Sequence, residues 1–293
     1  MNIKKYSFLK PYILLLPALT VLLILFLGGV ITAVAQSFGY YPLLGLEEVT
    51  LHYYYEMFTD PRFLGSLCYS LYLSTMSAVL SVVLGVLLAY QFFKMSKEHK
   101  IISLLYKLPI IVPHIVVALL IFLLFTQSGF FSRILYRLNI ISGMKEFPYL
   151  IFDRGGIGII MAYLWKQIPF VVLIVYTILR NINKNWEQVA QNLGANRWQI
   201  FWNIYLPLIL PGIGTAFIIV FAYSFGAYEI PILLGPTNPR PLSVLAYQRF
   251  SSLDLLQRPY AMVITVVLAL ICIILVLIYR KLLKYMVGVK ILN

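Results

Sequence analysis

Several predominantly apolar runs of about eighteen residues or more divide this chain, and they constrain its fold more than any other feature. A helix needs about 20 such residues to cross the hydrocarbon core of a membrane while satisfying its own backbone hydrogen bonds. The chain has 293 residues, 61% of them hydrophobic and 11% charged, with a mean hydropathy of +0.90. The sequence therefore predicts an all-α, polytopic membrane protein, residues 1–293, with a single transmembrane domain.

Six membrane spans are expected from these runs. They cover residues 12–36, 66–93, 108–125, 157–179, 208–225 and 261–279. The basic start and Ala33-Val34-Ala35 would also fit a cleavable signal peptide. The first apolar run is roughly twice the ~7 to 15 residues of a signal sequence, so we expect it to be retained. An even number of spans places both termini on one side.

The charge pattern predicts which side that is. The termini and the connections after the second and fourth spans contain fourteen of the 23 Lys and Arg residues. They contain only two of the ten acidic residues. These residues are Lys4, Lys5, Lys10, Lys94, Lys97, Lys100, Lys107, Arg180, Lys184, Arg197, Arg280, Lys281, Lys284 and Lys290, with Glu98 and Glu187. The positive-inside rule makes this face cytoplasmic. The excess charge then reflects topology and contact with anionic membrane lipid, and no nucleic-acid partner is expected.

A polar, helix-prone segment, residues 183–207, interrupts the apolar pattern on this cytoplasmic face. Asn185 is expected to cap a first helix, with Gln188 in a capping-box position, and Gly194 is expected to end it. This helix would carry one apolar face, made by Trp186, Val189, Ala190 and Leu193. A short helix with an apolar stripe is suited to docking in a groove of another protein.

A second helix is expected to follow directly. Asn196, with Gln199 in the capping-box position, would start a helix that runs toward Pro207, a residue tolerated mainly near a helix start or break. The same periodicity would place four aromatic residues on one face, namely Trp198, Phe201, Trp202 and Tyr205.

These residues resemble the EAA loop of inner-membrane permeases from binding-protein-dependent ABC importers. Leu193-Gly194-Ala195 matches the usual LGA of the family, and Ile204, Leu206 and Pro207 follow at the family's spacing. The E-A-A triplet falls on Gln188, Val189 and Ala190, so Gln stands where the family usually has Glu. An acid, Glu187, stands one place earlier.

The resemblance extends over most of the chain, about residues 62–285, and implies a type I ABC importer permease fold in the bacterial cytoplasmic membrane. It implies a second permease subunit, homologous or identical, two ATP-binding subunits, and an extracytoplasmic solute-binding protein. ATP and Mg would be bound by the partner ATPase, so no cofactor is expected on this chain. The implied ATPase-coupling residues are Trp186, Glu187, Gln188, Val189, Ala190, Leu193, Gly194, Ala195, Ile204, Leu206 and Pro207.

The solute is indicated less directly. Residues 225–235 and 240–247 are most similar to the subgroup often labelled spermidine/putrescine permeases. That similarity favours a polyamine-like or other small charged solute. The same label covers importers of iron and phosphonates, and these, with sugars, are the alternatives.

Four residues are expected to border the solute pathway. Tyr228 and Glu229 lie in a segment too apolar for open solvent and too broken by Gly and Pro for a span, so its backbone must be shielded by protein or line a cavity. Lys166 and His114 are polar residues at membrane depth. Three of the four have a structural alternative: Lys166 could reach headgroups or pair structurally, His114 could be packed and hydrogen-bonded, and Glu229 could be a loop charge.

Motifs for enzyme chemistry are missing from the sequence. It contains no GxxxxGK[ST] phosphate loop, no HExxH and no GxSxG, and no metal-binding constellation is expected. Cys68 and Cys272 are expected to be small buried residues. A secondary transporter or channel that works without an ATPase is the alternative function, and it would want charged residues paired across spans.

Overall fold

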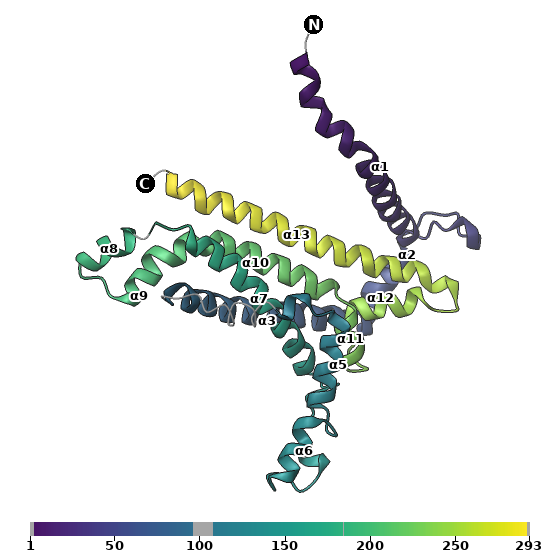
Figure 1. Ribbon diagram of the computed structural model, residues 1–293. Helices are drawn as coiled ribbons and strands as arrows, with labels where there is room; N and C mark the ends of the chain where they lie inside the picture. Colours follow the sequence, from purple (N-terminus) through teal and green to yellow (C-terminus); the bar gives the residue numbers. More distant parts are fainter. Residues whose placement is uncertain (1–2, 96–107, 184, 292–293) are drawn as a thin grey trace. The chain divides into compact units, whose positions relative to one another are not determined.

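The structure is a computed structural model that describes residues 3–95, 108–183 and 185–291 (Figure 1). All the elements named in this part of the chain are helical, which confirms the all-α prediction. Six helical stretches within it are long and apolar enough to cross a membrane. Five charges that contribute to the predicted orientation, Lys97, Glu98, Lys100, Lys107 and Lys184, lie outside the described residues.

The chain forms two compact units, which are described separately. The first unit comprises the chain up to Pro61 together with Ala246–Ala269. It contains α1 (Ile3–Ser37), a 3₁₀ turn (Pro42–Leu44), α2 (His52–Thr59), a 3₁₀ turn (Leu255–Gln257), the end of α12 (Leu242–Phe250) and the start of α13 (Arg258–Ile291). Within it the hydroxyl of Tyr260 donates to a carboxylate oxygen of Glu56, and the Tyr53 and Tyr260 rings meet edge to face at 5.0 Å.

The second unit comprises Arg62–Leu245 and the chain from Leu270 onward. It contains nearly all of α3 (Pro61–Lys94), followed by α5 (His114–Phe125), α6 (Phe130–Arg137), a 3₁₀ turn (Met144–Glu146), α7 (Ile157–Arg180), α8 (Asn185–Asn192), α9 (Arg197–Ile200), a π-helical turn (Phe201–Tyr205), α10 (Leu206–Gly226) and α11 (Glu229–Leu234), with the start of α12 and the end of α13. All the candidate site residues lie in this unit.

The third span differs from its prediction. Residues 108–125 do not form one helix, because the helical turn at residues 108–111 stops before Pro113 and α5 starts at His114. Proline has no backbone N–H and its ring clashes with the preceding turn, which explains the break. Hydropathy could not reveal it, since both sides of the break are equally apolar.

The fifth span is longer than predicted. The helix that starts at Arg197 does not stop before Pro207 but continues through the π-helical turn into α10. In that turn the backbone N–H of Leu206 donates to the carbonyl oxygen of Phe201, five residues back. The wider turn accommodates Pro207, whose ring would clash with the carbonyl four residues back in a regular α-helix.

The broken segment after α10 is shielded by protein, as its composition predicted. Its short helix α11 packs against α5 and α7. Ile230 and Leu234 are buried there in one apolar cluster with residues of α3, α5 and α7. Members of that cluster include Tyr69, Leu73, Val117, Ala118, Ile159, Ala162 and Tyr163.

α3 and α7 approach each other closely at Gly85. A Cβ atom at Gly85 would lie 2.6 Å from Cγ1 of Val171, so the contact requires glycine. α3 also carries five buried serines, namely Ser66, Ser70, Ser74, Ser77 and Ser81. Small residues of this kind allow helices to pack closely in membranes.

The prediction that both cysteines are buried is wrong. Cys68 is exposed and Cys272 is half-buried.

Candidate functional site

The first candidate site is the segment 183–207, and its first helix, α8, begins differently from the prediction. Asn185 is already helical, and its backbone N–H donates to Oδ1 of Asn183 at 3.0 Å. Asn183 therefore caps the helix in place of Asn185. The prediction missed this because both asparagines are favourable caps and the sequence does not distinguish them.

The end of α8 is where the sequence placed it. Gly194 has φ +83°, its backbone N–H donates to the carbonyl of Gln191, and the N–H of Ala195 donates to the carbonyl of Ala190. These two bonds form a Schellman motif, which normally places glycine in the left-handed conformation. The predicted role of Gly194 as the helix end is confirmed.

The second helix also starts as predicted. The Asn196 side chain accepts from the backbone N–H of Gln199 at 2.9 Å, and the Gln199 side chain accepts from the N–H of Asn196 at 2.8 Å. This reciprocal pair is a complete capping box. Farther along, Ile204, Leu206 and Pro207 are half-buried where the helix joins α10.

The apolar face of α8 is open to its surroundings. None of the eight residues of α8 is buried. Trp186 is 52% exposed and Val189 57% exposed, and Leu193, which follows the helix, is 82% exposed. Gln188 is exposed as well, while Ala190 and Ala195 are half-buried. The helix thus presents a tryptophan and two branched aliphatic side chains with no covering layer from the described residues of this chain.

The four aromatic residues of the second helix do not share one face, so that prediction is wrong. Phe201 and Tyr205 are buried, whereas Trp198 is 70% and Trp202 58% exposed. Phe201 and Tyr205 pack edge to face against Tyr90 near the end of α3, with ring centroids 4.8 and 5.8 Å away. The prediction treated the segment as a free amphipathic helix and did not anticipate that α3 would cover one side of it.

Glu187 connects α8 to two spans. One carboxylate oxygen accepts from the ammonium group of Lys94 at the end of α3, and the other accepts from the hydroxyl of Tyr205 at 2.5 Å. The Lys94 ammonium also lies 5.1 Å from the centre of the Tyr205 ring. The charge pattern of the sequence indicates only a topological role for Lys94. The signal that could have indicated this cluster is that Glu187 is the only acid in the segment.

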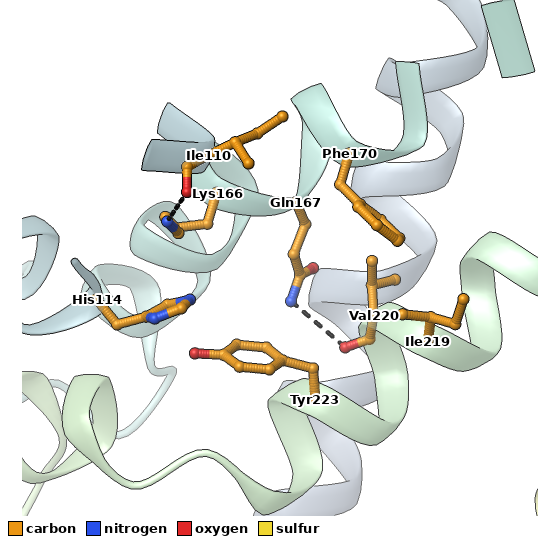
Figure 2. A pocket seen from close by; sticks show the side chains of 8 residues that line it. All are labelled: Ile110, His114, Lys166, Gln167, Phe170, Ile219, Val220 and Tyr223. Carbon is orange, nitrogen blue, oxygen red and sulfur yellow. Dashed lines mark hydrogen bonds between the residues drawn. The ribbon is translucent and has the colours of Figure 1, made fainter. Parts of the chain in front are cut away.

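The second candidate site is a pocket of about 240 Å³ at membrane depth, formed where α7 and α10 meet the broken third span. Figure 2 shows Gln167, His114 and Tyr223 directed toward the same space. The described residues that line it are Ile110, His114, Lys166, Gln167, Phe170, Ile219, Val220 and Tyr223. The lining is mainly apolar with a few convergent polar groups, which is typical of small-molecule sites.

Lys166 holds the break in the third span. Its ammonium nitrogen lies 2.7 Å from the carbonyl oxygen of Pro109, 3.3 Å from that of Ile110 and 2.6 Å from that of Val112 (Figure 2 shows the second of these bonds). A break in a helix leaves carbonyl groups without their usual partners, and the ammonium group supplies three donors for them. Lys166 therefore borders the pocket while its charge is directed to the backbone.

The other three predicted pathway residues lie in different places. His114 lines the pocket and packs against Tyr223, with ring centroids 4.8 Å apart. Glu229 is exposed at the first position of α11, and Tyr228 is half-buried just before it. The described residues that line the pocket include Lys166 and His114 but neither Tyr228 nor Glu229.

Sequence reasoning missed Gln167, which forms the polar floor of the pocket. Its side-chain amide donates to the hydroxyl of Ser224 on α10, and its carbonyl oxygen accepts from the hydroxyl of Ser81 on α3 at 2.9 Å. A buried network of this kind ties three spans together. Among the described residues no group of three or more His, Cys, Asp or Glu could hold a metal ion.

These features define a polytopic membrane protein with a short helix whose apolar side chains are exposed and a small pocket between its spans. The chain belongs to the family of binding-protein-dependent transport system inner membrane components, whose model matches residues 81–286. It is thus a multi-pass inner-membrane protein.

The relatives agree with this assignment. The chain is 27% identical over 218 residues to the inner membrane ABC transporter permease protein YnjC of Escherichia coli, covering 72% of this chain and 39% of that protein. It is 30% identical over 167 residues to the ferric transport system permease protein FbpB of Actinobacillus pleuropneumoniae, covering 57% of this chain and 23% of that protein. The sulfate transport system permease protein CysT of Escherichia coli is 26% identical over 194 residues, with 66% of each chain covered. The matches therefore span less than half the length of the first two relatives.

A solved structure supports the fold. One chain of a bacterial ABC transporter involved in the import of the acidic polysaccharide alginate superposes with a TM-score of 0.77 and 20% identity, covering 95% of this chain and 98% of that one. This likeness establishes the type I ABC importer permease fold for the chain. Ferric, sulfate and molybdenum transport permeases are among its relatives, so the spermidine/putrescine resemblance stays a prediction.

Proposed function

We propose that this chain forms part of the membrane pathway of an ATP-driven importer and receives its motion from a separate ATPase through residues 183–207. The exposed apolar face of α8 carries the proposal. Trp186 and Val189 are exposed on a helix that is fixed at both ends by capping bonds, and the exposed Leu193 follows it directly. Such a helix fits the groove of a partner protein, with the apolar residues as anchors.

The proposed assembly follows from the family. A second permease chain, homologous or identical, would complete the pathway, two ATP-binding subunits would bind the cytoplasmic face, and an extracytoplasmic protein would deliver the solute. The family description names a binding-protein-dependent system, and one similar structure is that of an alginate transporter with its periplasmic protein bound to an alginate pentasaccharide. ATP and Mg would be held by the partner ATPase.

The cytoplasmic position of α8 is supported by charge. Lys94 and Arg180 are the last residues of α3 and α7, Arg197 begins α9 within the segment, and Arg280 and Lys281 lie in the second half of α13. An excess of Lys and Arg marks the cytoplasmic side of inner-membrane proteins. The same side carries the ATPase in an importer, so orientation and docking surface agree.

The proposed solute is small and charged. The pocket of about 240 Å³ has room for such a molecule, and its polar groups come from His114, Gln167 and Tyr223. A polyamine-like cation is the first candidate, and iron, phosphonate and sugar are the alternatives. A thermal-shift panel on the cognate extracytoplasmic binding protein identifies the solute, because the true ligand raises its unfolding temperature.

Co-purification tests the proposed function. The chain, extracted in mild detergent from the membranes of its native cells, should retain an ATPase. Leu193→Asp should release that ATPase, because it places a charge in the apolar contact, while Asn192→Asp, on the same turn, serves as a matched control that should retain it. Solute flux through the purified chain without any ATPase would instead support a secondary transporter or channel.

A further inference from the structure

Glu187 lies on α8 one place before the position where the resemblance puts the family's Glu, and Gln188 occupies that position. Adjacent helical residues point about 100° apart, so an acid one place before the motif position faces a different direction. Gln188, at the motif position, is exposed. Glu187 faces inward, to Lys94 and Tyr205.

The two partners of Glu187 belong to different spans. Lys94 is the last residue of α3, and Tyr205 ends the π-helical turn that leads into α10. Tyr205 is 1% exposed and packs edge to face against Phe93 and Tyr90 of α3, with ring centroids 5.3 and 5.8 Å away. One carboxylate is thus joined to the ends of two transmembrane helices.

Packing alone does not hold α8 in this position. None of its residues is buried. After the helix the chain passes through Gly194, and a Cβ atom placed on Gly194 would have no other atom within 4 Å. Polar bonds from α8 to the spans therefore contribute much of what holds α8 in its orientation. Hydrogen bonds to charged groups are the stronger kind, and the loss of one shifts a two-state equilibrium by about tenfold.

We propose that Glu187 is the positioning residue that makes α8 move together with α3 and α10, through Lys94 and Tyr205. This inference rests on the proposed function, because α8 must receive motion from an ATPase. Tyr205 allows the link to be tested apart from docking. Its hydroxyl is buried, so Tyr205→Phe removes a bond to Glu187 without altering the surface that a partner protein would touch.

The test follows a nucleotide-driven change inside the membrane and does not require the solute. The co-purified complex of permease and ATPase is prepared with Cys68→Ala and Cys272→Ala, and Ile219→Cys is added as a reporter in the pocket. The rate of its labelling by N-ethylmaleimide is measured with and without the non-hydrolysable nucleotide AMP-PNP and Mg. In this background the nucleotide should change the labelling rate.

Tyr205→Phe and Lys94→Met should each reduce the nucleotide-induced shift of the labelling equilibrium by about tenfold, with ATPase content unchanged and AMP-PNP present at saturation. Lys94→Arg, which keeps the cation, should retain the effect, and so should Tyr72→Phe, which removes a hydroxyl from an exposed position of α3. A full nucleotide effect in Tyr205→Phe would overturn the role of Glu187 while leaving the proposed function intact. A background complex that contains no ATPase, or does not respond to nucleotide, would overturn the proposed function and this inference together.

Discussion

The ammonium nitrogen of Lys166 lies 2.6 Å from the backbone carbonyl oxygen of Val112, and this bond joins the middle of α7 to the break that precedes α5. The same group reaches the carbonyl oxygens of Pro109 and Ile110. A charged residue inside a span is commonly a functional candidate, but here its donors are directed to backbone acceptors that the break leaves open. Lys166 acts in this position as a structural cap that also borders the pocket.

Lys166→Met should destabilise the protein. It removes the donors from three carbonyl groups in a region with little access to water, and although it also removes the cost of burying a charge, we expect a net loss of about 2–3 kcal/mol. Chemical denaturation in detergent micelles, followed by tryptophan fluorescence, measures the change. Lys145→Met, at an exposed position of a 3₁₀ turn, is the control and should be near neutral. A Lys166→Met protein as stable as the wild type would show that the carbonyls find other partners.

Close packing at Gly85 gives a second prediction. A Cβ at this position would lie 2.6 and 2.7 Å from Cγ1 and Cβ of Val171, so Gly85→Ala forces α3 and α7 apart. Overpacking of this kind costs about 1–3 kcal/mol. Gly65→Ala is a matched control on the same helix, where the added methyl meets no atom within 4 Å.

A double-mutant cycle checks the assignment of that cost. Val171→Ala removes the atoms that collide with the new methyl group, so Gly85→Ala should be less harmful in its presence than alone. Additive effects of the two substitutions on the free energy of unfolding would contradict a direct contact between these positions.

The sequence determined some of these features and could not determine others. Span locations follow from the length of apolar runs, and Gly194 and Asn196 were found because helix ends have local rules. The break before His114 lies within a run of uniform hydropathy, so the apolar pattern predicts an uninterrupted span through Pro113. The bonds of Lys166 to Val112 and of Glu187 to Lys94 join residues far apart in sequence, and local patterns carry no information about such pairs.

Replacement of Gly194 should separate ATP hydrolysis from import. Gly194 has φ +83°, and a β-branched residue there costs about 1–2 kcal/mol of backbone strain. Because open space surrounds the position, Gly194→Val acts through the backbone alone and should turn α8 away from its orientation. The ratio of ATP hydrolysed to solute imported, measured in proteoliposomes, should rise several-fold. This is the effect expected when the native orientation of α8 loses about 1–2 kcal/mol relative to other orientations.

Gly194→Asn is the control for that substitution. Asparagine tolerates the left-handed conformation better than other side chains, so this variant should couple hydrolysis to import nearly as well as the wild type. Unchanged coupling in Gly194→Val, with the protein inserted in normal amounts, would contradict a role for the orientation of α8.

Glu229 provides the last prediction, which concerns the solute. Its carboxylate is exposed at the first position of α11, and α11 is anchored by Ile230 and Leu234 in the cluster formed with α3, α5 and α7. The charge can therefore be removed without disturbing packing. If Glu229 attracts a cationic solute, Glu229→Gln should raise the KM for its uptake by about tenfold, the effect of losing one charged hydrogen bond, and leave kcat and assembly unchanged. Glu47→Gln, at an exposed position before α2, is the matched control. Equal uptake by Glu229→Gln and wild type over a range of solute concentrations would remove Glu229 from the pathway and leave its carboxylate as a surface charge.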